Sequence, residues 1–535
     1  MTARVATASE TVACERTTIS SGTPATELME RAGRVAAKEI ARRFHLMLPG
    51  GVAVFTGPGN NGGDGWVVAR SLAELDFPVT VIEAAPAKTE EARAAEESAG
   101  ITAGSVASGT VAADAPNLGS APVVIDALLG TGATGAPRGT IASAIEILNQ
   151  ARRDGAAIVA LDLPSGLDAT TGDHELCVHA DLTLTFGVAK RGHLLAREVC
   201  GEIAVLDIGL SDEPPLNSLP ELIDREWVAA RIPVIPSNAH KGMRGRLAIV
   251  AGGKGMAGAA ILSGRGALRS GIGLLRMAVT RENILAIHAG LPEAIVQEWP
   301  NDPAALASFA AIADAMALGP GLGNSPATRD LVERVLLAWK GPVVVDADAL
   351  NVFAGDAESL ATLLRGRPAV ITPHPAELGR LLGRDTSDVM ANRFEIGADF
   401  ARNSGAVVLL KGSPTVIFSP MGERYVSAAG TAALATGGSG DVLTGIVGTL
   451  LAQMVTLPHE SDDALEATGA PDTPGGRSVA EAAAVAAFVH GRAAELCGPV
   501  RGAALEDILL ALQEAWNEPD APTAPGTIAC IPAVP

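Results

Sequence analysis

Aromatic residues and cysteines are scarce in this sequence. Its 535 residues include one tyrosine, five tryptophans and ten phenylalanines, so the hydrophobic core must rest on aliphatic side chains. The five cysteines, at positions 14, 177, 200, 497 and 530, are odd in number, widely spaced and without a CxxC pair. This pattern argues against both a disulfide framework and a zinc site.

Positive charge is also scarce. The sequence has 40 Lys and Arg against 60 Asp and Glu, which gives a net charge of −20. Nucleic acids and anionic membranes reward basic surfaces, so we expect neither as a partner. The N-terminus lacks a basic start followed by an apolar run, and apolar stretches break before about 18 residues. We therefore expect no signal peptide, no transmembrane helix and a cytoplasmic location.

What is present is the composition of a globular protein, with 48% apolar and 19% charged residues. The length exceeds the size at which a single core keeps growing, so two or more domains are expected. We predict an N-terminal domain over residues 1–215, a linker at 216–224, a C-terminal domain over 225–515 and a disordered tail over 516–535. The polar stretch Leu457–Arg477 is predicted to be a surface insertion.

Both halves alternate short β-rich runs with helical patterns. Continuous Val, Ile and Ala runs indicate strands buried on both faces, and their alternation with helices predicts an α/β fold with parallel, doubly wound sheets. The helices predicted most clearly are Gly65–Leu75, Ile141–Arg152, one from about Gly440 and Val479–Leu496. The predicted strands are Val52–Thr56, Val79–Glu83, Val123–Asp126, Ala157–Asp162, Leu182–Phe186, Ile203–Asp207, Leu247–Val250, Leu274–Val279, Ala315–Leu318, Val343–Asp346, Ala369–Thr372, Val407–Lys411 and Thr415–Phe418.

A glycine-rich stretch, Gly57–Gly65 (GPGNNGGDG), follows the first predicted strand. Glycines let backbone amides approach a diphosphate, and the following helix N-terminus favours an anion. The stretch also satisfies GxGxxG, with Glu83 about 20 residues further on, where a ribose-binding acid would sit. By itself the pattern is weak, because a tight turn without a ligand has the same composition.

Three further predicted strands end in similar loops. Asp126 precedes a second glycine loop, Asp162 and Ser165 follow another strand, and Lys190 lies just after a third. Loops after the carboxyl ends of parallel strands face one crevice, so these side chains are predicted to converge with the first glycine-rich stretch. Their oxygens suit a hard cation beside phosphate.

The strongest signal in the second half is Thr436–Gly445 (TGGSGDVLTG). Small residues that open a helix form an anion hole from backbone amides, where a transferring phosphoryl group can rest. Asp441 at the helix start could accept a proton from a substrate hydroxyl. The sequence holds no GxxxxGK[ST], which excludes a P-loop enzyme. Further candidate site loops are His240–Gly242, Gly319–Gly323, Val345–Asn351, Thr372–Glu377 and Lys411–Thr415.

GPGNNGGDGWVVAR, VVIDALLGTGATG and LDLPSGLDATTG resemble the motifs of the NAD(P)HX epimerase family, over roughly residues 10–212. The resemblance implies a Rossmann-like three-layer fold and a potassium ion held by Asn61, Asp126 and Ser165. It implies proton transfer by Asp162, with Lys190 nearby. The implied NADPHX-binding residues are Asn60, Asn61, Gly62, Gly63, Asp64, Gly130, Thr131, Gly132, Ala133, Thr134, Gly135, Ala136 and Asp162.

The second set of motifs (HKG, GPGLG, TPHPAE, KGSPT and GGSGD) resembles the ADP/ATP-dependent NAD(P)H-hydrate dehydratase family, over about residues 225–515. The resemblance implies a ribokinase-like α/β fold, ADP as co-substrate, magnesium and Asp441 as the base. The implied ADP-binding residues are Lys411, Gly412, Ser413, Pro414, Thr415 and Gly440. The implied contacts to the hydrate are Ala260, Gly323, His374 and Asp441.

Together the resemblances imply an enzyme that epimerises hydrated NADH and NADPH (NADHX and NADPHX) and dehydrates the S form with ADP, leaving AMP and phosphate. We expect a homo-oligomer. The main alternative is a ribokinase-like small-molecule kinase fused to a nucleotide-binding or interaction domain. A non-catalytic N-terminal module also stays open. An ordinary NAD-dependent oxidoreductase is less favoured, since GxGxxG is its only support.

Overall fold

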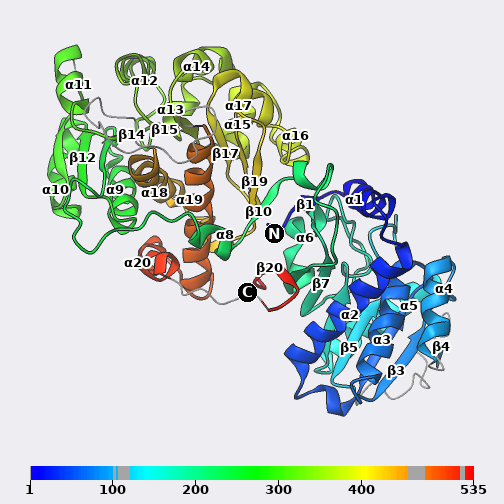
Figure 1. The fold of residues 1–535 in the computed structure, drawn as a ribbon. Coiled ribbons are helices and arrows are strands. Elements are labelled where there is room, and N and C mark those ends of the chain that lie inside the picture. The colour runs from blue at the N-terminus through cyan, green and yellow to red at the C-terminus, as the bar shows by residue number, and fades with distance from the viewer. Residues whose placement is uncertain are drawn as a thin grey trace. The chain divides into compact units, whose positions relative to one another are not determined.

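The computed structural model describes residues 2–100, 104–105, 121–300, 302–455, 476–517 and 524–534. The described residues of Met1–Asp224 and Ala521–Val534 form one compact unit, and those of Arg225–Asp520 form the other. Each unit is built on a mainly parallel β-sheet with helices packed on it (Figure 1), which confirms the predicted α/β class. Across these ranges no helix is both long and apolar enough to cross a membrane. Most of the expected insertion, residues 457–475, lies outside the described residues.

The first unit contains a sheet in the order β20-β9-β7-β6-β5-β2-β3-β4, parallel except for β20. Its strands are β2 (Val52–Thr56), β3 (Val79–Glu83), β4 (Gly104–Ser105), β5 (Val123–Ala127), β6 (Ala157–Leu161), β7 (Leu182–Phe186), β9 (Glu202–Leu206) and β20 (Thr527–Ile531). The remaining elements are β1 (Val5–Ala6), which pairs with β8 (Ala189–Lys190), α1 (Ala8–Ser20), α2 (Ala25–Phe44), α3 (Asn60–Ala73), α4 (Glu90–Ala99), α5 (Gly139–Arg153), α6 (Arg191–Leu195), α7 (Arg197–Cys200) and β10 (Glu221–Ile223).

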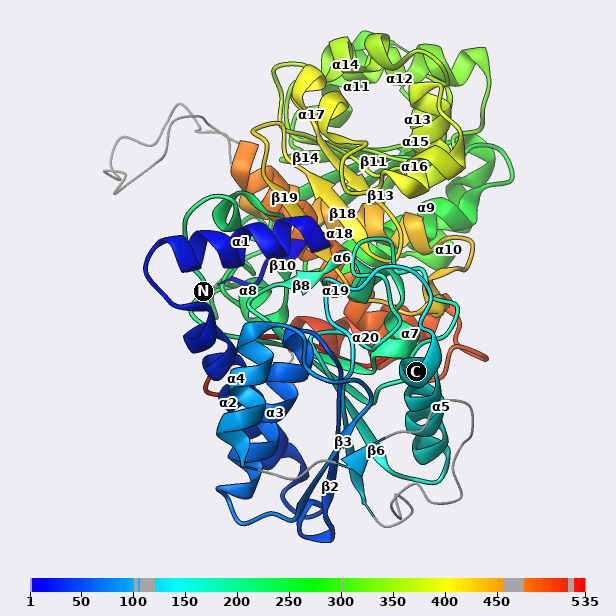
Figure 2. The ribbon, with the colours of Figure 1, turned by 90° about the vertical axis from the view of Figure 1, so that its right-hand side faces the viewer.

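Alternating residues of the strands at the middle of this sheet face two different helix layers. In β2, Val52 and Val54 join the core cluster formed with α2 and α3, whereas Ala53 and Phe55 join the cluster formed with α5. Successive strand side chains point to opposite faces, so a run that is apolar throughout must be covered on both sides. Figure 2 shows α3 and α5 on opposite sides of this sheet, which makes the unit the predicted three-layer arrangement.

The helix after β2 begins at Asn60, not near Gly65 as the sequence suggested. Most of the glycine-rich stretch is therefore helix and not loop. A Cβ on Gly62 would lie 2.0 Å from the carbonyl oxygen of Gly57, and one on Gly65 would lie 2.5 Å from Cβ of Ala127. These glycines let the first turns of α3 pack closely against the strand ends, a requirement that looks identical to a phosphate-binding loop in the sequence.

The chain end was predicted to be disordered over residues 516–535, and this is wrong for the part the structure describes. Strand β20 pairs antiparallel with β9 at the edge of the first unit's sheet. Ala529 is fully buried, and the carbonyl of Gly526 accepts a hydrogen bond from the Asp207 amide at 2.8 Å. The short apolar run was hidden by the prolines around it. The first unit thus draws its edge strand from the far end of the sequence.

The second unit contains a sheet whose strands follow the order β19-β18-β17-β16-β15-β14-β11-β12-β13. Pairing is parallel from β13 to β17 and antiparallel from β17 to β19. Its strands are β11 (Arg246–Val250), β12 (Leu274–Val279), β13 (Ile295–Glu298), β14 (Ala315–Leu318), β15 (Val343–Val345), β16 (Ala369–Ile371), β17 (Val407–Leu410), β18 (Thr415–Phe418) and β19 (Arg424–Ser427).

Helices cover both sides of this second sheet, with α18 and α19 on one side and α12 and α14 on the other (Figure 1). Gly445 in α18 allows a close approach to α9, since a Cβ there would lie 2.0 Å from the carbonyl oxygen of Ser263. The helices are α8 (Arg225–Ala229), α9 (Ala257–Arg269), α10 (Ile284–Gly290), α11 (Pro303–Ala310), α12 (Pro326–Ala338), α13 (Asp348–Asn351), α14 (Ala357–Leu364), α15 (Pro375–Leu382), α16 (Thr386–Ala391), α17 (Ala398–Ser404), α18 (Ser439–Met454), α19 (Gly476–Leu496) and α20 (Leu505–Asn517).

Candidate active sites

Asp162 and Lys190 form an ion pair at the carboxyl edge of the first sheet. Lys190 is fully buried, and its Nζ donates to Asp162 Oδ1 at 2.5 Å and to Thr185 Oγ1 at 2.7 Å. The other oxygen, Oδ2, accepts from the amide and the hydroxyl of Thr131 at 3.1 and 2.6 Å. Burial alone would raise the pKa of Asp162, but the ammonium of Lys190 holds it below its ordinary value. Asp162 is thus an ionised carboxylate in an enclosed site.

A second buried carboxyl group, that of Asp64, lies close enough to Asp162 and Lys190 for their charges to affect its pKa. The pKa of Asp64, in α3, is raised well above its ordinary value by burial and by the negative charges of Asp162 and Glu15. His193 is also buried, and burial together with the Lys190 charge lowers its pKa to about 3. Asp64 is therefore harder to ionise than an ordinary carboxyl group, whereas Asp162 is ionised and His193 is uncharged at neutral pH. Two neighbouring carboxyl groups whose pKa values are shifted in opposite directions are the arrangement expected where acid and base work side by side.

The three residues predicted to hold potassium come together at the carboxyl ends of β2, β5 and β6. Asp126 is fully buried and accepts from the hydroxyl and the amide of Ser165 at 2.6 and 2.8 Å. Asn61 donates through Nδ2 to the carbonyl of Leu129 at 2.9 Å, while its buried Oδ1 has no hydrogen-bond partner. Burial raises the pKa of Asp126 to about 6. An unpartnered oxygen beside a buried carboxylate is what a monovalent cation would satisfy.

The predicted nucleotide-binding loop adjoins the same place. Gly130 lies between Asn61 and Asp162, since an added Cβ would be 3.0 Å from Cβ of Asn61 and 3.3 Å from Oδ2 of Asp162. A cavity of about 500 Å³ is lined by Gly130, Ala133, Gly135 and Ala136 together with residues of the Leu163–Glu175 segment. Residues 132–136 are exposed, as is Asn60 at the start of α3. These positions are accessible to a ligand from solvent.

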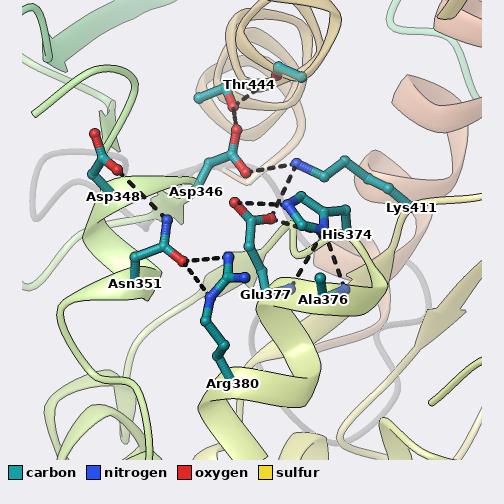
Figure 3. Close-up of polar contacts among 10 residues, drawn as sticks. Asp346, Asp348, Asn351, His374, Ala376, Glu377, Arg380, Lys411 and Thr444 are labelled. Carbon is teal, nitrogen blue, oxygen red and sulfur yellow. Dashed lines mark hydrogen bonds and ion pairs between the residues drawn. The ribbon is translucent and has the colours of Figure 1, made fainter. Parts of the chain in front are cut away.

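In the second unit, Lys411 lies between two carboxylates at the carboxyl ends of β15, β16 and β17 (Figure 3). Its Nζ is 2.9 Å from Oδ1 of Asp346 and 3.7 Å from Oε2 of Glu377. Asp346 is almost fully buried, and its Oδ2 accepts from Thr444 Oγ1 of α18 at 2.6 Å. Burial would lower the pKa of Lys411, but Asp346 and Glu377 raise it above its ordinary value. Lys411 therefore stays charged.

Asp441 is in the first turn of α18, close to this cluster. Burial and the like charge of Asp346 raise its pKa to about 7, against the opposing effect of Lys411. Gly440 leaves room for the lysine, since a Cβ there would lie 3.2 Å from Lys411 Nζ. A carboxyl group that is half-ionised near neutral pH, at the N-terminus of a helix, is suited to accept a proton from an alcohol.

His374 caps α15, with its Nδ1 accepting from the amides of Ala376 and Glu377 at 3.2 and 3.4 Å. Burial lowers its pKa, and its side chain is 46% exposed, so it presents a neutral ring to solvent. Gly323, also exposed, donates its amide to Asp348 Oδ2 at 2.7 Å. Ala260 is different, because its side chain is fully buried in α9. Its backbone is buried as well, so Ala260 is not open to a ligand in this structure.

The remaining predicted ADP-binding residues continue from Lys411 as a turn. Gly412, with φ of 156°, and Ser413 are exposed, whereas Pro414 is buried after a cis peptide bond. Thr415 donates its hydroxyl to the carbonyl of Gly412 at 3.0 Å, which closes the turn.

Sequence reasoning missed several polar residues that the structure brings into these sites. The loops holding Asp346 and Glu377 were recognised, but neither residue was given a role, although Asp346 ends a predicted strand as Asp126 does. Thr444 lies within the Thr436–Gly445 motif but was given no role, although it donates to Asp346. Thr185 and Glu15 carry no local signal, because only the tertiary fold brings them near Lys190 and Asp162.

Two family models match the chain, one over each unit. Residues 25–192 match the model of the YjeF-related protein N-terminus, and residues 247–512 match the model of NAD(P)H-hydrate dehydratase. The bifunctional NAD(P)H-hydrate repair enzyme Nnr of Moorella thermoacetica is 37% identical over 503 residues, which are 90% of this chain and 89% of the relative. The enzyme of the same name from Escherichia coli is 35% identical over 81% of this chain and 82% of its own.

Among solved structures, the ADP/ATP-dependent NAD(P)H-hydrate dehydratase of Bacillus subtilis, co-crystallised with ATP and Mg²⁺, is 30% identical. It covers 55% of this chain and 96% of its own, with a TM-score of 0.44.

Proposed function

Because this chain belongs to the family of bifunctional NAD(P)H-hydrate repair enzymes, we propose that its two units hold the two active sites of that repair. The first unit interconverts the R and S forms of NADHX and NADPHX at Asp162. The second unit converts the S form to NADH or NADPH, with ADP as the phosphoryl donor. The observation that carries this proposal is Asp441, which opens α18 beside the buried Lys411–Asp346 pair.

Dehydration in the second unit begins with a proton transfer to Asp441. As Asp441 takes the proton from the C6 hydroxyl, the oxygen attacks the terminal phosphorus of ADP, and AMP leaves. Phosphate then leaves C6 with the bonding electron pair while a proton leaves C5, which restores the ring double bond. The amides that open α18 stabilise the charge on the transferring phosphoryl group. Lys411–Thr415 and Gly440 bind ADP, and Gly323 and His374 contact the hydrate.

Magnesium fits the charges of this second site. Asp346 and Glu377 supply carboxylate oxygens around Lys411, and Mg²⁺ is commonly held by one or two carboxylates together with substrate phosphates. When bound, the ion offsets the negative charge that builds up on the phosphates. The carboxylates of this chain would hold it beside the ADP-binding turn.

Epimerisation in the first unit requires C6 to lose and regain its hydroxyl group. The C6–O bond breaks with its electron pair on oxygen, the lone pair of ring nitrogen N1 forms a C=N bond, and water adds back from the other face. The ionised Asp162 takes the proton of the incoming water and returns it to the departed hydroxide, which leaves as water. Lys190 keeps the carboxylate charged. Residues 60–64 and 130–136 bind the dinucleotide.

Potassium fits the set Asn61, Asp126 and Ser165, through the unpartnered Oδ1 of Asn61 and the buried carboxylate of Asp126. Once bound, the cation supplies positive charge next to the dinucleotide phosphates. The chain's own part is to hold the two loops together, which the hydrogen bonds through Leu129 and Ser165 accomplish.

A ribokinase-like kinase fused to an unrelated nucleotide-binding module is not favoured, since relatives covering 90% and 81% of this chain carry both parts under one repair function. The homo-oligomer and the cytoplasmic location stay predictions from the sequence.

The dehydratase assignment is tested with Asp441→Asn, assayed for NADH formation from the S hydrate with ADP and Mg²⁺. Loss of the base should lower the rate by roughly 10²–10⁴-fold while the chain remains folded. Asp330→Asn, an exposed carboxylate on α12, is the matched control and should keep the full rate. A rate for Asp441→Asn equal to that of the control would remove Asp441 from the mechanism.

A further inference from the structure

Helix α19 supports the segment that connects β19 to α18, which we call the phosphoryl loop (residues 430–439). The amide of Gly430, at the start of the loop, donates to Glu495 Oε1 at 2.9 Å. The hydroxyl of Thr431 donates to the carbonyl of Ala494 at 3.3 Å. At the other end of the loop, Ser439 Oγ lies 3.3 Å from Nε2 of His490. Both ends of the phosphoryl loop are thus attached to about one and a half turns of α19.

The packing between α19 and the loop is close. A Cβ on Gly491 would lie 2.4 Å from the carbonyl oxygen of Ala429, so only glycine allows this approach. Glu495 is itself held, because Arg492 donates to its second carboxylate oxygen at 2.9 Å. Glu495 therefore holds the Gly430 amide while its own position is held by a neighbour on α19.

His490 is the contact nearest to the chemistry. It is 6% exposed, and Ser439, the first residue of α18, is 5% exposed. Burial and the charge of Lys411 lower the pKa of His490 to about 4. The imidazole is therefore neutral, and it can share a hydrogen bond with a serine hydroxyl without adding charge beside the phosphoryl site.

We propose that His490 is a positioning residue of the dehydratase site, which acts through its hydrogen bond to Ser439. Ser439 directly precedes Gly440 and Asp441, so a rotation of this first turn displaces both the ADP-binding backbone and the base. Misplacement by about 1 Å can cost about 10²-fold in rate. The inference rests on the proposed ADP-dependent dehydration.

The test compares four variants in steady-state dehydration of the S hydrate: His490→Leu, His490→Gln, Ser439→Ala and the double variant His490→Leu/Ser439→Ala. His490→Leu should lower kcat by about tenfold to a hundredfold and change KM for ADP much less. His490→Gln, which keeps a hydrogen-bonding group, should recover most of kcat. The double variant should be no slower than the worse single variant, because both substitutions remove one interaction.

Val485→Ala, at another buried position of α19, is the control for simple destabilisation. It should lower the thermal midpoint without the loss of kcat. The inference is overturned if His490→Leu behaves like Val485→Ala, if glutamine does not recover activity, or if the two single losses multiply in the double variant. Wild-type protein that forms no NADH with ADP would overturn the proposed function as well, so the two failures are distinguishable.

Discussion

The pKa of Asp441 leads to a specific pH dependence of the dehydratase. The base must be ionised to accept the hydroxyl proton, and its pKa is raised to about 7 by burial and by Asp346. The ionised fraction therefore rises with pH through neutrality. It goes from about one tenth at about pH 6 to about nine tenths at about pH 8, so kcat/KM should rise about tenfold. A carboxyl group with the ordinary pKa of 3.8 would be fully ionised at both pH values and would give a flat profile.

The structure also predicts how the rising part of the pH profile of kcat/KM, its acidic limb, shifts in a variant. Asp346→Asn removes the like charge that is the second cause of the raised pKa, so the limb should shift to lower pH. Asp330→Asn, on the surface of α12, should leave the limb where it is. The assay is the initial rate of NADH formation at subsaturating S hydrate, because kcat/KM reports the ionisation of the free enzyme. A flat wild-type profile, or a shift to higher pH in Asp346→Asn, would refute the reasoning.

Two further predictions concern the first unit. Asp126→Ala should weaken hydrate binding and lower epimerase activity while sparing the dehydratase. The wild-type epimerase should depend on potassium in the same assay. If epimerase turnover responds neither to the substitution nor to the removal of potassium, Asn61, Asp126 and Ser165 are simple loop caps. Deletion of residues 524–535 removes β20 and uncovers the edge of β9, so it should lower the thermal midpoint of epimerase inactivation by several degrees, on the scale of roughly 1–3 kcal/mol. An unchanged midpoint would show that β20 contributes nothing to the unit.

The strands were predictable because strands buried on both faces require continuous runs of apolar or β-branched residues. Five-residue runs such as Val52–Thr56 and Leu182–Phe186 are apolar or β-branched throughout, as parallel strands covered on both faces must be, and their predicted bounds match the structure. The start of α3 was not predictable, since the glycines that pack it against β2 resemble a loop. Strand β20 was missed because its partner, β9, lies about 320 residues earlier.

Some residues of the candidate sites could likewise be predicted from the sequence, and others could not. Asp162 and Asp441 could be picked out because each lies within a motif, Asp162 at the end of a strand and Asp441 at the start of a helix. The partners that set their protonation, Lys190 for the first and Asp346 for the second, act through distance and burial. Distances between side chains and their burial are set only in the folded chain, so the sequence could not predict them. His490 illustrates the limit, since nothing around it in the sequence marks it, and only the packing of α19 brings it to Ser439.

The central claim is that one chain carries two separate sites. The most direct test measures NADH formation from pure R and pure S hydrates in the presence of ADP, Mg²⁺ and potassium. It compares the wild-type protein with Asp162→Asn. Wild type should recover both hydrates. Asp162→Asn should convert the S hydrate at the wild-type rate and recover the R hydrate only as fast as it epimerises spontaneously. Normal recovery of the R hydrate by Asp162→Asn, or loss of S hydrate conversion in that variant, would contradict the account.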